Sequence, residues 1–261
     1  MNREETISYM NNHGILPESK FGQNFLCDEE IIEAIVELSS ATADDKVLEI
    51  GPGIGALTRE FRANDIDITA VEIDKRLAQY LSEEGFNIVV SDYTKLKVED
   101  YEPSKYTVAV SNIPYYVMTP IMMKMMSDLT NCRKMTFMVE DAAIDRIDAK
   151  PGSKQYGPLA VMCSSYGDFE REFTVPSGCF VPAPHTTSAV ITLTRREGDT
   201  FVPDSAYAQF LTRCFANRRK KLTNGVPEAK EALGKLDIDS NIRAEQLTPE
   251  QFKALYAIIN S

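Results

Sequence analysis

An asparagine, a proline and two tyrosines interrupt an apolar run in the segment SNIPYYVMTP, residues 111–120. Asn112 offers a side-chain carbonyl oxygen, and Pro114 fixes φ and removes an amide donor beside the Ile113 carbonyl. Two acceptors that face one point suit the exocyclic amine of a base such as adenine. Because the lone pair of that amine is delocalised, hydrogen bonds from both its protons favour the pyramidal form that attacks a methyl group. Tyr115 adds a ring face for stacking.

A glycine loop, EIGPGIGALT at residues 49–58, is the second segment whose residue types suit ligand binding. Gly51, Gly53 and Ala56 match the pattern G-x-G-x-x-G/A, in which glycines let the backbone approach a ligand at the start of a helix. Glu72 follows 21 positions after Gly51, where a carboxylate can accept both hydroxyls of a ribose. The loop and the carboxylate leave NAD and S-adenosylmethionine equally open as ligands.

Three further features favour S-adenosylmethionine over NAD. Glu49 precedes the first glycine, Asp92 ends the third predicted strand, and NIPYY ends the fourth. A ligand that carries adenine, ribose, an amino acid and a sulfonium needs successive polar contacts along the carboxyl ends of several strands, which these positions provide.

Five apolar, β-branched runs alternate with amphipathic helical patterns. Continuous apolar strands separated by helices indicate a parallel sheet covered on both faces, hence a Rossmann-like α/β domain. The predicted strands are residues 46–51, 67–74, 87–92, 107–113 and 135–140. A leading helix is expected to begin at Asp28 as its N-cap.

The segments that follow the fifth strand differ in pattern. Residues 168–175 and 187–195 alternate with period two around a proline-rich loop, which predicts an antiparallel pair at the sheet edge. Tyr116 is expected to pack inward, and Thr119 to be the N-cap of the buried helix that follows it. We expect residues 1–199 to form the catalytic domain with an N-terminal arm, and residues 200–261 a small helical domain.

Composition narrows the class of protein. The chain holds only two histidines and five cysteines, and the cysteines are widely spaced, so neither a metal site nor a disulfide framework is predicted. No signal peptide or membrane span is indicated, so we expect a cytoplasmic protein. The formal net charge is −11, yet residues 213–221 hold five cations and no anion. That basic patch is either a solvated surface or a phosphate-binding site.

Eight motifs in order along the chain resemble the ribosomal RNA adenine dimethyltransferase family, within it the type that modifies small-subunit RNA. They are KFGQNFL (20–26), VLEIGPGIGALT (47–58), VEID (71–74), SDY (91–93), NIPYY (112–116), AKPGSKQYGPLAV (149–161), FVPAPHTTSAV (180–190) and FANRRKKL (215–222).

The resemblance implies roles for particular residues. Phe180 would stack on the target adenine opposite Tyr115, in an enzyme that takes the base out of its helix and methylates it twice. S-adenosylmethionine would contact Asn24, Leu26, Gly51, Gly53, Glu72, Asp92 and Asn112. The basic patch would contact RNA phosphates through Arg213, Arg218, Arg219, Lys220 and Lys221. The partner implied is ribosomal RNA in a small-subunit precursor, bound by a monomer without a metal.

Three residues depart from the family pattern. Glu140 and Asp141 replace a Gln-Lys pair, and His185 occupies a position that is usually basic. Two other functions therefore stay open beside the leading one. The first is a large-subunit adenine methyltransferase of the macrolide-resistance type, and the second is a divergent paralogue or assembly factor with another RNA target.

Overall fold

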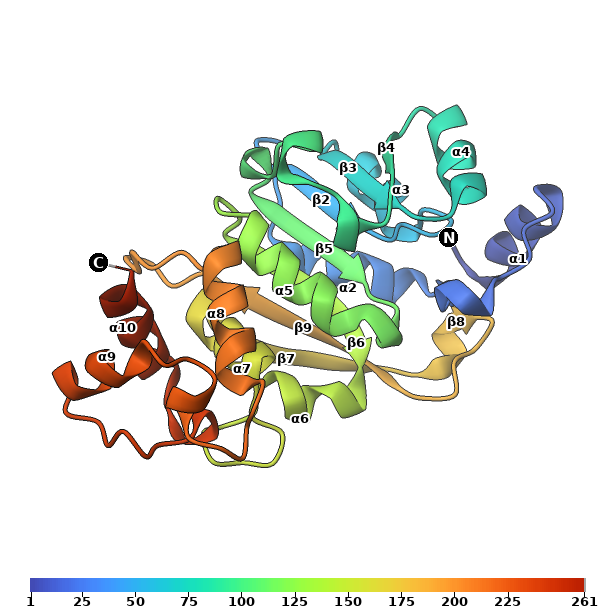
Figure 1. The fold of residues 1–261 in the computed structure, drawn as a ribbon. Helices are drawn as coiled ribbons and strands as arrows, with labels where there is room; N and C mark the ends of the chain where they lie inside the picture. The colour runs from blue at the N-terminus through green and yellow to red at the C-terminus, as the bar shows by residue number, and fades with distance from the viewer. Residues whose placement is uncertain (261) are drawn as a thin grey trace. The chain divides into compact units, whose positions relative to one another are not determined.

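A computed structural model describes residues 1–260 of the chain (Figure 1). Its centre is a seven-stranded sheet in the order β4-β3-β2-β5-β6-β9-β7. The strands are β2 (Lys46–Ile50), β3 (Asp67–Glu72), β4 (Asn87–Val90), β5 (Val108–Asn112), β6 (Lys134–Glu140), β7 (Asp168–Val175) and β9 (Ser188–Thr194). The first five in spatial order pair in parallel, and β9 runs antiparallel to β6. The predicted Rossmann-like fold is confirmed.

The strand order reverses between β2 and β5. From β2 the chain first adds β3 and β4 on one side, and then returns to place β5 on the other side. In open parallel sheets, such a reversal leaves a crevice at the carboxyl ends of the two strands, where ligands bind. The glycine loop after β2 and the NIPYY segment after β5 therefore meet at this crevice.

The strands are mostly apolar because both faces of the sheet are covered. Val47, Val108 and Val110 are 0% exposed and belong to one core with residues of α2 and α3. The leading helix α2 (Glu29–Ser39) begins as predicted, because the Asp28 side chain accepts a hydrogen bond from the Ile31 amide at 3.2 Å. The next helices are α3 (Ala56–Ala63), α4 (Lys75–Glu83) and α5 (Met118–Asp128).

The start of α5 differs from the prediction. A 3₁₀ turn at Tyr115–Val117 leads directly into the helix, which begins at Met118. Thr119 therefore lies inside the first turn and is not the N-cap. The turn compacts the chain before the helix, a local geometry that apolar periodicity does not reveal.

Two short strands lie outside the main sheet. β1 (Phe25–Leu26) pairs antiparallel with β8 (Phe180–Val181), with Leu26 opposite Phe180. The N-terminal helix α1 (Arg3–Asn12) supports β8, since Arg3 donates a hydrogen bond from Nη1 to the Phe180 carbonyl at 3.2 Å. This pairing joins the N-terminal arm to the proline-rich loop.

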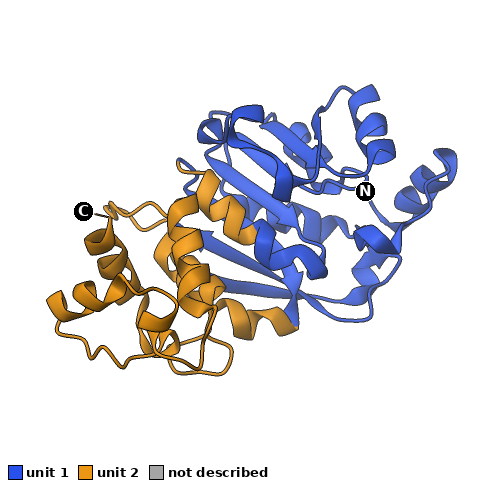
Figure 2. Cartoon of the chain, viewed as in Figure 1, with its two compact units in different colours: residues 1–121, 131–141, 170–194 blue, residues 122–130, 142–169, 195–261 orange. Residues whose placement is uncertain are grey.

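The chain divides into two compact units (Figure 2). Unit 1 comprises residues 1–121, 131–141 and 170–194, and unit 2 comprises residues 122–130, 142–169 and 195–261. Unit 2 contains α6 (Ile144–Ile147), α7 (Pro158–Tyr166), α8 (Ser205–Phe215), α9 (Ala229–Lys235) and α10 (Pro249–Ile259). Tyr207, Phe210 and Phe252 fill its aromatic core. The functional division at residues 199 and 200 stays a prediction.

Candidate functional site

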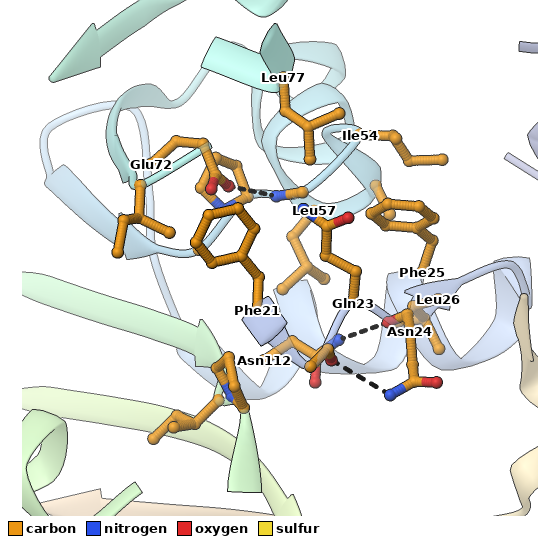
Figure 3. A pocket seen from close by; sticks show the side chains of 18 of the residues that line it. Phe21, Gln23, Asn24, Phe25, Leu26, Ile54, Leu57, Glu72, Leu77 and Asn112 are labelled. Carbon is orange, nitrogen blue, oxygen red and sulfur yellow. Dashed lines mark hydrogen bonds between the residues drawn. The ribbon is translucent and has the colours of Figure 1, made fainter. Parts of the chain in front are cut away.

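One pocket of unit 1 opens at the crevice between β2 and β5 (Figure 3). Its walls come from the glycine loop, the end of β3, the NIPYY segment, the arm at residues 21–26 and Phe180 of β8. Almost every residue predicted to bind the cofactor or the target base lines it: Asn24, Leu26, Gly51, Gly53, Glu72, Asn112, Ile113, Pro114, Tyr115 and Phe180. Their roles stay predictions, but their proximity is now a structural fact.

The glycine loop adopts a conformation that side chains would obstruct. Gly51 and Gly53 have φ of 73° and 58°, in the left-handed region that favours glycine. A Cβ atom on Gly53 would lie 3.1 Å from the Phe25 ring, so the loop and the arm approach closely only because this position is glycine. The loop then leads into α3 at Ala56, and the backbone of the loop lies against the pocket.

Glu72 is held at the end of β3 by two backbone donors. Its carboxylate accepts hydrogen bonds from the Gly53 amide at 3.1 Å and the Asp74 amide at 2.8 Å, as Figure 3 shows for Gly53. Only 4% of the residue is exposed, and this burial raises the pKa of Glu72 to about 7. A buried carboxylate with remaining acceptor capacity suits a ligand that brings hydroxyl donors.

A second buried carboxylate, Glu49, connects the two elements that flank the glycine loop. Thr58 of α3 donates a hydrogen bond from Oγ1 to Glu49 Oε2 at 2.6 Å. Burial raises the pKa of Glu49 to about 7 as well. The carboxylate therefore ties β2 to α3 across the glycine loop, while it also lines the pocket.

Asn112 ends β5 with its amide group turned toward the arm. Its Nδ2 donates to the Asn24 carbonyl oxygen across 3.5 Å, and Asn24 Nδ2 donates to the Gly22 carbonyl at 3.1 Å (Figure 3). Within residues 1–260, no donor occupies Asn112 Oδ1. This oxygen can therefore accept a hydrogen bond from a ligand amine in the pocket.

Two aromatic rings line the same pocket, Tyr115 from the turn after β5 and Phe180 from β8. The Tyr115 hydroxyl hydrogen-bonds the Ser188 hydroxyl of β9 at 2.7 Å, which fixes the ring position. Phe180 is 1% exposed and reaches the pocket through the pairing of β8 with β1. The pairing brings a residue of the proline-rich loop to the arm, as the implied role of Phe180 requires.

Asp92 is the predicted cofactor residue that does not line the pocket. Its carboxylate caps the turn at Tyr93–Lys95, accepting hydrogen bonds from the Thr94 amide at 3.0 Å and the Thr94 hydroxyl at 2.7 Å. The Thr94 hydroxyl and the adjacent Lys95 lower the pKa of Asp92. A role at the adenine amine stays a prediction.

Several pocket residues were not assigned from the sequence. They are mostly apolar: Phe21, Gln23, Phe25, Ile54, Leu57, Ile73, Leu77 and Tyr116. Phe21, Gln23 and Phe25 fall within the motif KFGQNFL, so this motif is the sequence signal that identifies them as pocket residues. Tyr116 was interpreted as core, and this prediction is wrong, because 63% of the residue is exposed.

The basic patch of unit 2 is not one helix face. Helix α8 ends at Phe215, so four of the five predicted RNA-binding cations follow it in a turn. Two of the five are engaged within the unit: Arg213 pairs with Glu228, and Arg218 Nε pairs with Glu245 at 2.7 Å. Arg219, Lys220 and Lys221 are exposed.

Residues 1–260 contain neither a candidate metal centre nor a membrane-spanning helix. No group of three or more histidine, cysteine or acidic side chains in this part of the chain could hold a metal ion. None of the helices there combines the length and apolar character that crossing a bilayer requires. All five cysteines are free thiols.

Comparison with known proteins extends over nearly the whole chain. The model of the family described as ribosomal RNA adenine dimethylase matches residues 16–261. Ribosomal RNA small subunit methyltransferase A of Lachnoclostridium phytofermentans is 36% identical and aligns over 98% of this chain and 96% of its own. Its counterpart in Bacillus licheniformis is 35% identical, with coverage of 96% and 94%.

Two solved structures share the fold. A dimethyladenosine transferase from Plasmodium falciparum superposes with a TM-score of 0.70 at 21% identity, covering 90% of this chain and 97% of that one. The 23S rRNA methyltransferase ErmE gives a TM-score of 0.61 at 24% identity, with coverage of 91% and 100%. Both likenesses extend the fold similarity beyond the sheet to most of the chain.

Proposed function

The chain belongs to the ribosomal RNA adenine dimethylase family, and on this basis we propose that it dimethylates the N6 amine of adenine in small-subunit ribosomal RNA. The resemblance noted in the sequence is confirmed, and with it an enzyme that uses S-adenosylmethionine. The observation that supports the proposal most directly is one pocket that contains both the glycine loop with Glu72 and the segment from Asn112 to Tyr115.

The pocket residues fit S-adenosylmethionine. Glu72 is buried and retains acceptor capacity for both ribose hydroxyls, and Gly51 leaves room along the backbone that a Cβ would fill. When bound, the cofactor supplies an electrophilic methyl group on sulfur. We infer that Asn24 and Leu26 of the arm close the pocket over it, together with Asn112.

The target amine is positioned by the end of β5. Asn112 Oδ1 and the Ile113 carbonyl accept hydrogen bonds from its two N–H groups, Pro114 keeps the carbonyl free of a local donor, and Tyr115 and Phe180 stack on the base. The amine nitrogen forms the new bond to carbon while the sulfur–carbon bond breaks, and one amine proton leaves to water. Positioning and electrostatics supply the catalysis without a histidine base.

The RNA backbone would be held by the basic turn of unit 2. Arg219, Lys220 and Lys221 are exposed and suit phosphate contacts, whereas Arg213 and Arg218 also stabilise the turn through their carboxylate partners. We propose that the enzyme acts as a cytoplasmic monomer on a small-subunit precursor.

Mapping dimethyladenosine in both ribosomal RNAs, from cells with and without the gene, tests the proposal. We expect the modification to disappear from small-subunit RNA alone. Loss from large-subunit RNA would support the macrolide-resistance type instead. If neither RNA changed, an assembly factor or another RNA target would replace the proposed substrate.

Cofactor binding is expected to depend on pH through Glu72. The ribose hydroxyls are best accepted by the charged carboxylate, whose pKa in the free protein is raised to about 7 by burial. As the pH falls below 7, the charged fraction falls, so the Kd for S-adenosylmethionine should rise by up to about tenfold per pH unit. Isothermal titration between pH 5.5 and 8 measures this dependence.

The variant Glu72→Gln is the matched control for this titration. It keeps a hydrogen-bonding side chain of similar size but cannot titrate. Its Kd for S-adenosylmethionine should therefore be larger than that of the wild type and nearly independent of pH. A dependence that persists in Glu72→Gln would assign the titration to another group, with Glu49 as the next candidate because burial also raises its pKa to about 7.

A further inference from the structure

Tyr116 is a large aromatic side chain exposed at the opening of the pocket. It lines the pocket and yet is 63% exposed, whereas its neighbour Tyr115 is half-buried and held by Ser188. Within residues 1–260, the Tyr116 hydroxyl has no hydrogen-bond partner. A largely exposed ring contributes little to the stability of the fold, so stability does not explain why a tyrosine occupies this position.

The ring is nevertheless held in a defined place. A Cβ atom on Gly22 would lie 3.3 Å from Tyr116 Cε1 and 3.2 Å from Pro114 Cβ, so the ring rests against the backbone of the arm. Partial burial, and then the negative charge of Asp92, raise the pKa of the Tyr116 hydroxyl. The ring therefore lies against the arm at Gly22, with much of its surface open to solvent.

The two residues of the arm that precede Gly22 are a cation and an aromatic ring. Phe21 also lines the pocket, and Lys20 Nζ lies 4.6 Å from the centre of the Phe21 ring. The Lys20 side chain is 66% exposed, and its ammonium also pairs with Glu18. Phe21 is partly buried and Tyr116 is exposed, and aromatic rings combined with cations are what proteins use to hold single-stranded nucleic acid.

We propose that Tyr116 is a second stacking platform, which binds a nucleobase next to the target adenosine; this rests on the proposed function. An adenine can enter the pocket only if its chain neighbours lie at the opening, where an unstacked base needs a new partner. The face of Tyr116 provides one without reading the base identity. Tyr115 and Phe180 hold the reacting base, and Tyr116 holds the strand from which it comes.

The test compares Tyr116→Ala and Tyr116→Phe with the wild-type enzyme, using small-subunit particles from cells that lack the gene as the substrate. Stacking on one base predicts that Tyr116→Ala raises the KM for particles by about fivefold to 150-fold, with the Kd for S-adenosylmethionine unchanged. Tyr116→Phe keeps the ring and should behave like the wild type. Val98→Ala changes another exposed apolar side chain, 54% exposed and outside the pocket, and should have no effect.

Each other outcome overturns the inference. An unchanged KM for Tyr116→Ala would show that the ring contacts no base. A larger Kd for S-adenosylmethionine in the same variant would make Tyr116 a wall of the cofactor site. A loss in Tyr116→Phe equal to that in Tyr116→Ala would assign the effect to the hydroxyl. If the wild-type enzyme methylated no particle, the proposed function itself would fail, and this inference with it.

Discussion

Asn112→Ala is expected to abolish dimethyladenosine formation while the protein stays folded. The variant removes Oδ1, the acceptor proposed to hold one proton of the target amine, and removal of one positioned transition-state partner typically costs about 100-fold to 1,000-fold in kcat. Within residues 1–260, its one side-chain hydrogen bond, to the Asn24 carbonyl, spans 3.5 Å and contributes little to the fold. The unfolding temperature should therefore change little.

Single-turnover methylation of small-subunit particles at saturating S-adenosylmethionine measures this loss. Saturation is needed because Asn112 is also proposed to contact the cofactor, so a modest rise in Kd is expected. Asn11→Ala, which removes an exposed amide of α1, is the matched control and should keep the full rate. A rate for Asn112→Ala above about one-tenth of the wild-type rate would contradict the proposed role.

The sheet and the glycine loop could be predicted because their signals are local. Each parallel strand is a continuous apolar run, and Glu72 follows the loop at a spacing that one strand-helix-strand unit fixes. The placement of Asn112 and Tyr115 beside that loop then follows from the strand order at the reversal between β2 and β5. Local patterns and one topological rule were sufficient for most of the pocket.

The remainder depends on contacts between distant residues. No local signal indicates that β1 pairs with β8, yet this pairing brings Phe180 to the arm. Periodicity could not show that Tyr116 is exposed, because the 3₁₀ turn at Tyr115–Val117 decides which of the two rings faces solvent. The sequence predicts a basic patch at residues 213–221 but not its shape: α8 ends at Phe215, and carboxylates engage Arg213 and Arg218.

Tyr115→Ala is expected to impair RNA methylation far more than cofactor binding. The ring is proposed to stack on the target adenine, an interaction of about 1–3 kcal/mol per base, which corresponds to a loss of about fivefold to 150-fold in kcat/KM for RNA. The Kd for S-adenosylmethionine should stay within about twofold of the wild-type value. Equal losses in both measurements would make Tyr115 a wall of the cofactor pocket and not a base platform.

Variants that remove the hydrogen bond between Tyr115 and Ser188 test the position of the Tyr115 ring while the ring itself is kept. Ser188 is 1% exposed, and its hydroxyl lies 2.7 Å from the Tyr115 hydroxyl. Tyr115→Phe and Ser188→Ala each remove this bond but keep the ring, so each should lower kcat/KM only about twofold to tenfold. Because both variants break the same interaction, the double variant should lose no more than either one alone. Additive losses would mean that Ser188 acts on the reaction by a route other than the Tyr115 ring.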